Sequence, residues 1–223
     1  MTAKKTISDQ IAETLINDII NLELKPGEKL SETQLAQKLG ISRAPVHDAL
    51  AQLERQGLVK VVPKSGTFVS EISIKKVQDI CDVRLQLECY AAEVAAHRIS
   101  DEQIRALQIQ FDKLMEMDPE SEEKSKFVSE VDIMLHGMIF EICGNTIIPD
   151  IIDSYRPEIQ RIRKANIAWA NRKESTQLEM RKIFEALKHR DIYAARLAMQ
   201  EHILNIKAAV GTLPIAGGKT VGE

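Results

Sequence analysis

The sequence predicts a mainly α-helical chain in two parts: a small N-terminal module of helices that ends in a β-hairpin, and an antiparallel bundle of about six helices. Three observations predict this fold class. The 223 residues are 44% hydrophobic but only 4% aromatic, a composition that favours helices over sheets. Apolar residues recur at helical spacing along most of the chain. A single β-branched segment near residues 58–69 breaks that spacing.

The first 70 residues predict the order helix, helix, turn, helix, hairpin. A helix over 6–22 is stopped by Lys25-Pro26-Gly27. Ser31 is the expected N-cap of a short second helix ending at Leu39-Gly40, and Ser42 caps a third that runs to about Gln56. A strand over 58–62, a turn at 63–66 and a strand over 67–69 follow.

From about Ile74 onward the pattern is helical throughout. We expect helices over 75–98, 101–117, 121–143, 147–170, 174–189 and 191–209, with Pro157 kinking or splitting the fourth. We therefore assign residues 1–70 to the N-terminal module, 71–77 to a linker, 78–209 to the helical domain and 210–223 to a flexible tail.

Charge and cysteine usage exclude several classes of protein. The net charge is −3, and residues 1–70 carry 9 Lys/Arg against 8 Asp/Glu, so any nucleic-acid affinity depends on local placement of charge. The three cysteines lack CxxC spacing, which argues against a disulfide framework or a zinc knuckle and favours buried thiols. There is no signal-peptide pattern and no apolar run of about 18 residues. We expect a cytoplasmic protein with no membrane partner.

Residues 35–50 are typical of a helix-turn-helix, and with the hairpin they make a winged helix-turn-helix. The second helix of such a motif lies in the major groove of double-stranded DNA with its N-terminal residues toward the bases. The expected contacts are Ser42, Arg43 and His47 on that helix, and Lys64 and Gly66 at the hairpin tip. A module that binds protein instead of DNA is the alternative, because its net charge is only +1.

Over residues 7–70 the chain resembles the DNA-binding domain of the GntR family of bacterial regulators. The resemblance is carried by Leu24 to Leu30, by the segment from Leu35 to Leu50 and by Leu53 to Val59. The family usually has Ser-Arg-Thr-Pro-Val-Arg-Glu-Ala-Leu in the recognition helix. This chain departs from it at Ala44, His47 and Asp48, and Thr33 stands where some relatives have a DNA-contacting Arg. The resemblance therefore adds Thr33 and Ala44 to the expected DNA contacts.

Residues 75–209 resemble the FCD domain of the FadR subfamily. The matching segments are Arg84 to Glu88 with the alanines that follow, Asp132 to His136, Gly144-Asn145, Ala186-Leu187 with Asp191, and His202. The predicted count of six helices resembles the VanR-like branch. The resemblance implies a homodimer whose operator affinity changes when a small organic or sugar acid enters the bundle.

Asp132, His136 and His202 are candidate metal ligands. Asp132 and His136 lie four residues apart on one helix face, where a carboxylate and an imidazole can hold one divalent ion, and His202 lies on the last helix. Zinc, nickel and manganese suit such ligands. The resemblance implies a further His where this chain has Met180, whose thioether is a poor ligand for these ions. The alternatives are a buried hydrogen-bonded cluster without metal, or chance placement on the surface.

The candidate effector-binding residues are Arg84, Asn145 and Met180. Arg84 is the best of them because a guanidinium matches a carboxylate fork, although it could instead pair with Glu88 or Asp132. Asn145, Arg161 and Arg163 are weaker candidates that we expect at the surface or at helix caps. His97 and His189 should be exposed near helix ends.

These features predict a DNA-binding transcription regulator, more specifically a repressor that a small acid releases from its operator. A metal-responsive regulator, in which the ion is the signal, is the first alternative. A metal-dependent helical-bundle enzyme is the second. The chain has no HExxH motif, no nucleophile motif and no phosphate-binding glycine loop, so we expect no enzymatic activity.

Overall fold

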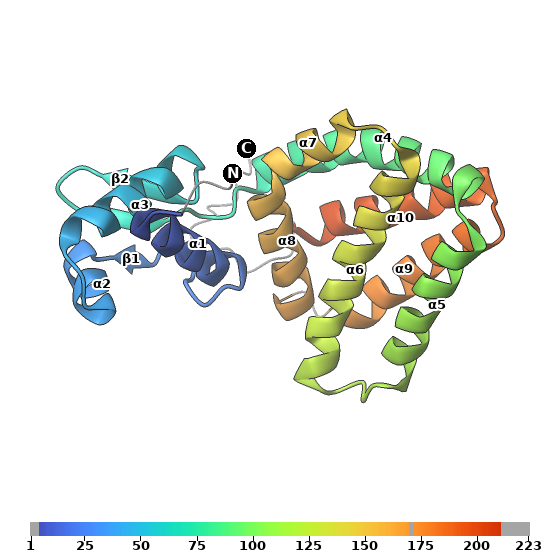
Figure 1. Cartoon of the computed structure of the whole chain (residues 1–223), viewed down its shortest axis with the longest axis horizontal. Coiled ribbons are helices and arrows are strands. Elements are labelled where there is room, and N and C mark those ends of the chain that lie inside the picture. Colours follow the sequence, from blue (N-terminus) through green and yellow to red (C-terminus); the bar gives the residue numbers. More distant parts are fainter. Residues whose placement is uncertain (1–4, 170–171, 211–223) are drawn as a thin grey trace, which may run out of the picture. The chain divides into compact units, whose positions relative to one another are not determined.

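The chain folds into two compact units that meet in sequence between Ser73 and Ile74. The computed structural model describes residues 5–169 and 172–210 (Figure 1). Within those ranges, no helix combines the length and the apolar character that crossing a membrane requires. The expected flexible tail begins at Val210, the last residue of a helix, and otherwise lies outside the described residues.

The N-terminal unit contains three helices and one small sheet. The helices are α1 (Ile7–Ile20), α2 (Glu32–Leu39) and α3 (Arg43–Arg55), and the strands are β1 (Lys29–Leu30), β2 (Val59–Val62) and β3 (Gly66–Val69). The sheet is antiparallel in the order β1-β3-β2, with Phe68 opposite both Lys29 and Lys60. Strand β1 is missing from the sequence prediction because two residues are too few to show an alternating pattern.

Apolar side chains from all three helices and from the sheet form the core of this unit. Leu15 and Ile19 of α1, Ala36 of α2, and Leu50 and Leu53 of α3 are buried together. Burial of these positions at helical spacing explains why the three helices form here.

Helix boundaries in this unit follow capping chemistry at two of the three predicted sites. The Ser31 side chain accepts a hydrogen bond from the Gln34 amide at 3.4 Å, and Gly40 ends α2 in the left-handed region at φ +66°. Ser42 has the extended backbone of an N-cap before α3, but its side chain makes no capping hydrogen bond. Ser42 therefore occupies the predicted N-cap position without the expected side-chain hydrogen bond, and the residue is exposed to solvent.

The second unit is entirely helical in the part that the structure describes. It comprises α4 (Ile74–Arg98), α5 (Asp101–Glu116), α6 (Glu122–Cys143), α7 (Ile147–Ser154), α8 (Arg156–Trp169), α9 (Lys173–Lys188) and α10 (Ile192–Val210). Helix α10 packs against α4 and α9, and α4 also packs against α6 (Figure 1). The alanine face of α4, with Ala91, Ala92, Ala95 and Ala96 fully buried, is what permits this close packing.

The described part of this unit has seven helices where the sequence predicts six. The predicted fourth helix is divided at Tyr155 into α7 and α8. Pro157 is the second residue of α8, where a missing N–H leaves no hydrogen bond unmade. The observed count therefore does not match the six helices from which we inferred the VanR-like branch. The expected linker at 71–77 overlaps the first turn of α4, which begins at Ile74.

Candidate functional site

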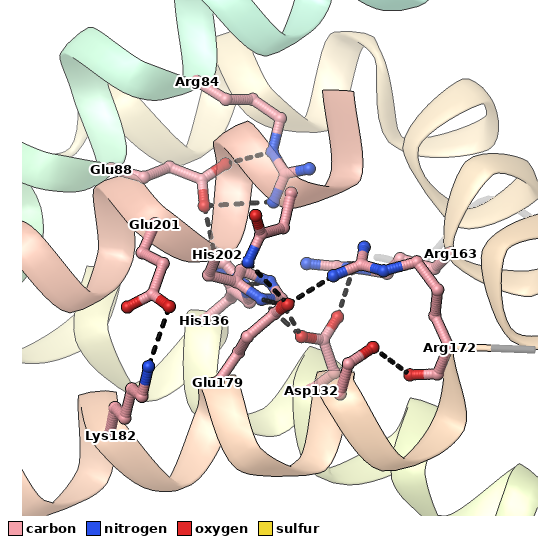
Figure 2. A network of polar contacts seen from close by, with 12 residues as sticks. Arg84, Glu88, Asp132, His136, Arg163, Arg172, Glu179, Lys182, Glu201 and His202 are labelled. Atoms are coloured by element: carbon pink, nitrogen blue, oxygen red, sulfur yellow. Dashed lines mark hydrogen bonds and ion pairs between the residues drawn. The ribbon is translucent and has the colours of Figure 1, made fainter. Parts of the chain in front are cut away.

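Three buried side chains converge between α6 and α10. They are Asp132 and His136 of α6 and His202 of α10, each at most 3% exposed (Figure 2). Asp132 Oδ1 lies 3.3 Å from His202 Nε2 and 3.5 Å from His136 Nε2. The two Nε2 atoms lie 3.4 Å apart. The structure therefore brings together the three residues that the sequence singles out as metal ligands.

The opposite nitrogen of each imidazole faces a buried glutamate. His136 Nδ1 lies 2.6 Å from Glu88 Oε2, and His202 Nδ1 lies 3.0 Å from Glu179 Oε2. Arg84 pairs with Glu88 through Nε at 2.6 Å and Nη2 at 3.3 Å. Asn205 and Arg172 both donate to the other oxygen of Glu179. Each histidine is thus oriented by a carboxylate that is itself held in place.

Charge within the cluster keeps the carboxylates ionised. Burial would raise the pKa of Asp132, but Arg163, whose Nε lies 2.5 Å from Asp132 Oδ2, and then His136 outweigh it and hold the pKa well below its usual value. Burial would likewise raise the pKa of Glu88, and Arg84 outweighs it, so this pKa also falls below its usual range. Burial lowers the pKa of His202, yet hydrogen bonds to Asp132 and Glu179 leave it raised.

The geometry of the cluster fits a divalent ion. Bonds of about 2.0–2.1 Å to a tetrahedral metal place neighbouring ligand atoms about 3.4 Å apart, which matches all three observed separations. Asp132 Oδ1 is buried and lies within 3.5 Å of both Nε2 atoms, so an anionic oxygen faces the space between the two imidazoles. The donors are two imidazoles and one carboxylate, which suit zinc, nickel or manganese.

A cavity of about 510 Å³ lies beside this cluster in the helical unit. Its wall includes His136 and Glu88 from the cluster, together with Arg163 of α8. Apolar side chains of α6, α7 and α8 line much of the rest: Ile133, Phe140, Pro149, Ile152 and Ile159. Arg156 and Asp153, joined by two hydrogen bonds, also line it. The cavity therefore combines an apolar wall with a cationic group next to the candidate metal ligands.

The predicted effector ligands take different places. Arg84 is 1% exposed, is paired with Glu88 and does not line the cavity, so the alternative pairing considered for it is the one the structure has. Asn145 lines the cavity but its Oδ1 accepts hydrogen bonds from the amides of Ile147 and Ile148 at the start of α7. Met180 is fully buried on α9 and is also absent from the cavity wall.

Two arginines expected at the surface are largely covered by neighbouring side chains. Arg161 is 3% exposed, and the Arg163 side chain is 12% exposed and contacts Asp132. Sequence reasoning underrated Arg163 because nothing in its spacing links α8 to α6. It also missed Glu88 and Glu179 as partners of the histidines. Only Glu88 had a signal, since it lies one helical turn from Arg84.

The remaining histidines and cysteines lie as predicted. His97 and His189 are exposed at helix ends. The thiols of Cys81, Cys89 and Cys143 are free and buried. Burial raises the pKa of Cys89 to about 11, which disfavours its reactive thiolate.

The candidate nucleic-acid interface lies on the N-terminal unit. Of the seven predicted contact residues, Gly66 is partly exposed. The other six are exposed: Thr33, Ser42, Arg43, Ala44, His47 and Lys64. Arg43 is 66% exposed and donates to Glu32 at 3.1 Å, while His47 Nδ1 lies 3.5 Å from Asp48. The guanidinium at the start of α3 is therefore accessible and lightly held.

Backbone geometry at the hairpin tip explains its glycine. Lys64 has φ +64° and Gly66 has φ +120°, a region that side chains rarely tolerate. A Cβ on Gly66 would also lie 3.0 Å from Lys29 Cε. The tip thus presents Lys64 on a tight turn beside a position that admits only glycine without strain.

Comparison with known proteins matches both units to family models. The model for bacterial regulatory proteins of the gntR family matches residues 7–69, and the model for the FCD domain matches residues 79–205. Both units identified by resemblance in the sequence are therefore matched.

Relatives of known sequence and structure agree with these matches. The HTH-type transcriptional repressor RspR of Escherichia coli (strain K12) is 28% identical over 204 residues, which cover 92% of this chain and 89% of RspR. The uncharacterised HTH-type transcriptional regulator YdhC of Bacillus subtilis is 27% identical over 186 residues, covering 83% and 81%. The structure of E. coli McbR/YncC aligns with a TM-score of 0.71 at 20% identity, covering 94% of this chain and 99% of the other. A transcriptional regulator from Rhodococcus sp. RHA1 aligns with a TM-score of 0.74 at 19% identity, covering 92% and 97%.

Proposed function

Because this chain belongs to the gntR family of bacterial regulatory proteins and carries an FCD domain, we propose how a helix-turn-helix transcriptional regulator of this kind is controlled. A small acid that binds in the helical unit changes the affinity of the protein for its DNA operator. The family and these relatives are regulators and not enzymes. The observation that carries the proposal is the cavity of about 510 Å³, whose wall contains both Arg163 and His136, one of the three candidate metal ligands.

The proposed DNA contacts are the exposed residues at the start of α3 and at the hairpin tip. Arg43 and His47 lie on one face of α3, so both can reach base edges when the helix enters the major groove. Lys64 and Gly66 would meet the DNA backbone or the minor groove. A neutral His47 can bond a single base edge but lacks the charged fork of an arginine, so this chain should select a different operator from relatives with Arg there.

The proposed effector is a small organic or sugar acid. Arg163 replaces Arg84 as the proposed carboxylate ligand, because Arg163 lines the cavity and the fork of Arg84 is occupied by Glu88. The Nε of Arg163 faces Asp132, which leaves the terminal nitrogens to meet an anion in the cavity. The apolar wall would hold the carbon skeleton of the acid.

We further propose that Asp132, His136 and His202 bind one divalent ion. When bound, the ion would supply a positive charge that attracts an acidic effector at the end of the cavity where His136 lies. Three protein ligands leave coordination positions for water or for effector oxygens. This arrangement also favours a second candidate function, a regulator that senses the metal itself.

The active species is proposed to be a homodimer that represses transcription. A winged helix reads only a short half-site, and a two-fold dimer reads two such sites with the symmetry of a palindromic operator. The name of the relative RspR, a repressor, supports repression as the mode of action.

Operator selection tests the proposal. Duplexes selected from a random pool by the full chain should bind more tightly than unselected DNA, with an affinity that falls as salt rises. Organic and sugar acids would then be titrated into the complex at fixed salt, with and without chelator. Release by an acid supports metabolite sensing, whereas release or binding that depends on the metal alone supports metal sensing. If no duplex is preferred over random sequence, the proposal fails.

A further inference from the structure

Glu179 is a buried carboxylate that contacts a candidate ligand but cannot itself join the metal. Its side chain projects from α9 toward α10, and the residue is 4% exposed (Figure 2). Its Oε2 lies 3.0 Å from His202 Nδ1, the nitrogen on the far side of the ring from Asp132. Both oxygens of Glu179 are engaged, because Asn205 Nδ2 donates to Oε1 at 2.9 Å and Arg172 also donates to Oε1.

This contact determines which ring nitrogen of His202 carries the proton. An ionised carboxylate can only accept hydrogen bonds, so His202 Nδ1 must donate to it. In the neutral ring the lone pair then resides on Nε2, which lies 3.3 Å from Asp132 Oδ1 and 3.4 Å from His136 Nε2. The donors on Oε1 hold Glu179 against Nδ1, which makes the shorter of the two carboxylate contacts of this ring, so the fold favours the tautomer with its lone pair on Nε2 whenever the ring is neutral.

We infer that Glu179 is a positioning residue that holds His202 in the metal-binding tautomer and strengthens it as a ligand. The inference rests on the metal site proposed above. A carboxylate behind a histidine raises the basicity of the ligating nitrogen, and loss of such a partner weakens metal binding about 10–100-fold. Its contribution matters because the cluster among the described residues offers three protein ligands, Asp132, His136 and His202, and His202 is one of them.

Zinc affinity and histidine tautomers test the inference in the full chain. Zn²⁺ affinity would be measured by competition with a chromophoric chelator, and the ring nitrogens by long-range ¹H–¹⁵N correlation spectra of the metal-free protein. Wild type should show His202 protonated at Nδ1. Glu179→Gln, which keeps the shape but removes the charge, should bind Zn²⁺ about 10–100-fold more weakly and lose the uniform His202 tautomer.

Two further variants separate positioning from general stability. Glu185→Gln changes a partly exposed glutamate of the same helix that contacts none of the candidate ligands, and it should leave both readouts unchanged. Asn205→Ala removes one donor to Glu179 and should give an intermediate loss, which provides a test even if Glu179→Gln folds poorly.

The outcomes distinguish this inference from the metal proposal. If wild type binds no Zn²⁺, the metal proposal fails, while the tautomer of His202 in the Glu179 and Asn205 variants still decides the role of Glu179. If wild type binds Zn²⁺ and Glu179→Gln binds it equally well with the tautomer unchanged, the inference about Glu179 is overturned.

Discussion

At the scale of single residues, Arg84 shows how burial determines the role of a charged side chain. Its guanidinium and the Glu88 carboxylate are each 1% exposed and form two contacts. Such a pair stabilises little compared with apolar packing, but removal of one partner leaves the other as an unpaired buried charge. Arg84 therefore holds Glu88 in place beside His136. Because its guanidinium is occupied by Glu88, we propose Arg163 as the ligand of the effector carboxylate.

We expect Arg84→Met to destabilise the chain by about 3–5 kcal/mol, since Glu88 would lose its only guanidinium partner among the described residues and keep a buried charge against the His136 imidazole alone. Urea denaturation followed by circular dichroism measures the loss. Arg196→Met is the matched control. Arg196 of α10 pairs with Glu93 of α4 at a more exposed position, so its loss should change stability little. Equal losses in the two variants would contradict this account.

Arg43 is the residue whose removal should affect DNA alone. Its side chain is exposed at the start of α3 and, within the part of the chain that the structure describes, donates to Glu32. Arg43→Ala should lower operator affinity by about 1–3 kcal/mol, because a guanidinium that meets a base edge or a phosphate is lost. Fluorescence anisotropy at fixed salt measures this. Arg55→Ala, at the other end of the same helix, serves as the control, and an identical effect there would argue against α3 entering the groove by its N-terminus.

At the scale of elements, two serines at equivalent helix positions differ in what they contribute. Ser31 accepts a hydrogen bond from the α2 backbone, whereas Ser42 makes no such bond to α3. Ser31→Ala should therefore cost about 1 kcal/mol of stability, and Ser42→Ala should cost almost nothing. Thermal denaturation of the two variants compares them directly. Because Ser42 faces solvent beside Arg43, its replacement should show itself in DNA affinity instead, and a large stability loss at Ser42 would refute this assignment.

Elements with strong local signals were predictable from sequence, and those that depend on partners were not. Helical periodicity located α1 to α3, and Gly40 and Gly144 marked the ends of α2 and α6 because both have positive φ. Strand β1 escaped because its two residues form a strand only by pairing with β3. The exact break at Tyr155 also escaped, since a proline can sit within the first turn of a helix as well as end one.

The residues of the candidate site were likewise predictable where a local pattern places them and not where helix packing does. Asp132 and His136 share one helix face, so their proximity follows from spacing alone, and His202 could be added by resemblance. The partners Glu88, Arg163 and Glu179 come from three other helices. Their contacts depend on how α4, α8 and α9 pack around α6 and α10, which no local pattern encodes.

At the scale of the whole molecule, metal binding should appear as added stability of the helical unit. Zn²⁺ at about 100 times its dissociation constant stabilises the bound state by about 2.7 kcal/mol. We expect a rise in Tm of roughly 5–10 °C over chelator-treated protein, since 1 kcal/mol shifts a unit of this size by about 2–4 °C. Calorimetry measures the shift. His136→Ala should abolish it and His97→Ala, at an exposed site, should retain it; identical behaviour of the two variants would remove the support for the cluster as the site.

The final expectation concerns coupling between the two units. Helix α4 begins directly after the N-terminal unit and carries Glu88, which lines the cavity about 20 Å further along the helix. An effector that favours one packing of α4 would thereby bias the attached DNA-binding module by its difference in affinity for the two packings. Such coupling is reciprocal: if the effector weakens operator binding about 5–150-fold, the operator must weaken effector binding by the same factor.

Both factors can be measured on the full chain, by operator titrations with and without effector and by effector titrations with and without operator. Arg163→Met should lose effector binding while it keeps the operator affinity of the effector-free protein, because Arg163 lines the cavity in the helical unit. Arg43→Ala should show the opposite pattern, because Arg43 lies in the DNA-binding module. If one equilibrium joins the two units, the effector and the operator should weaken each other's binding to wild type by equal factors. Each variant should be impaired in binding one ligand only. Unequal factors would mean that a third component takes part in the release, and loss of both ligands in either variant would overturn the assignment of two separate sites.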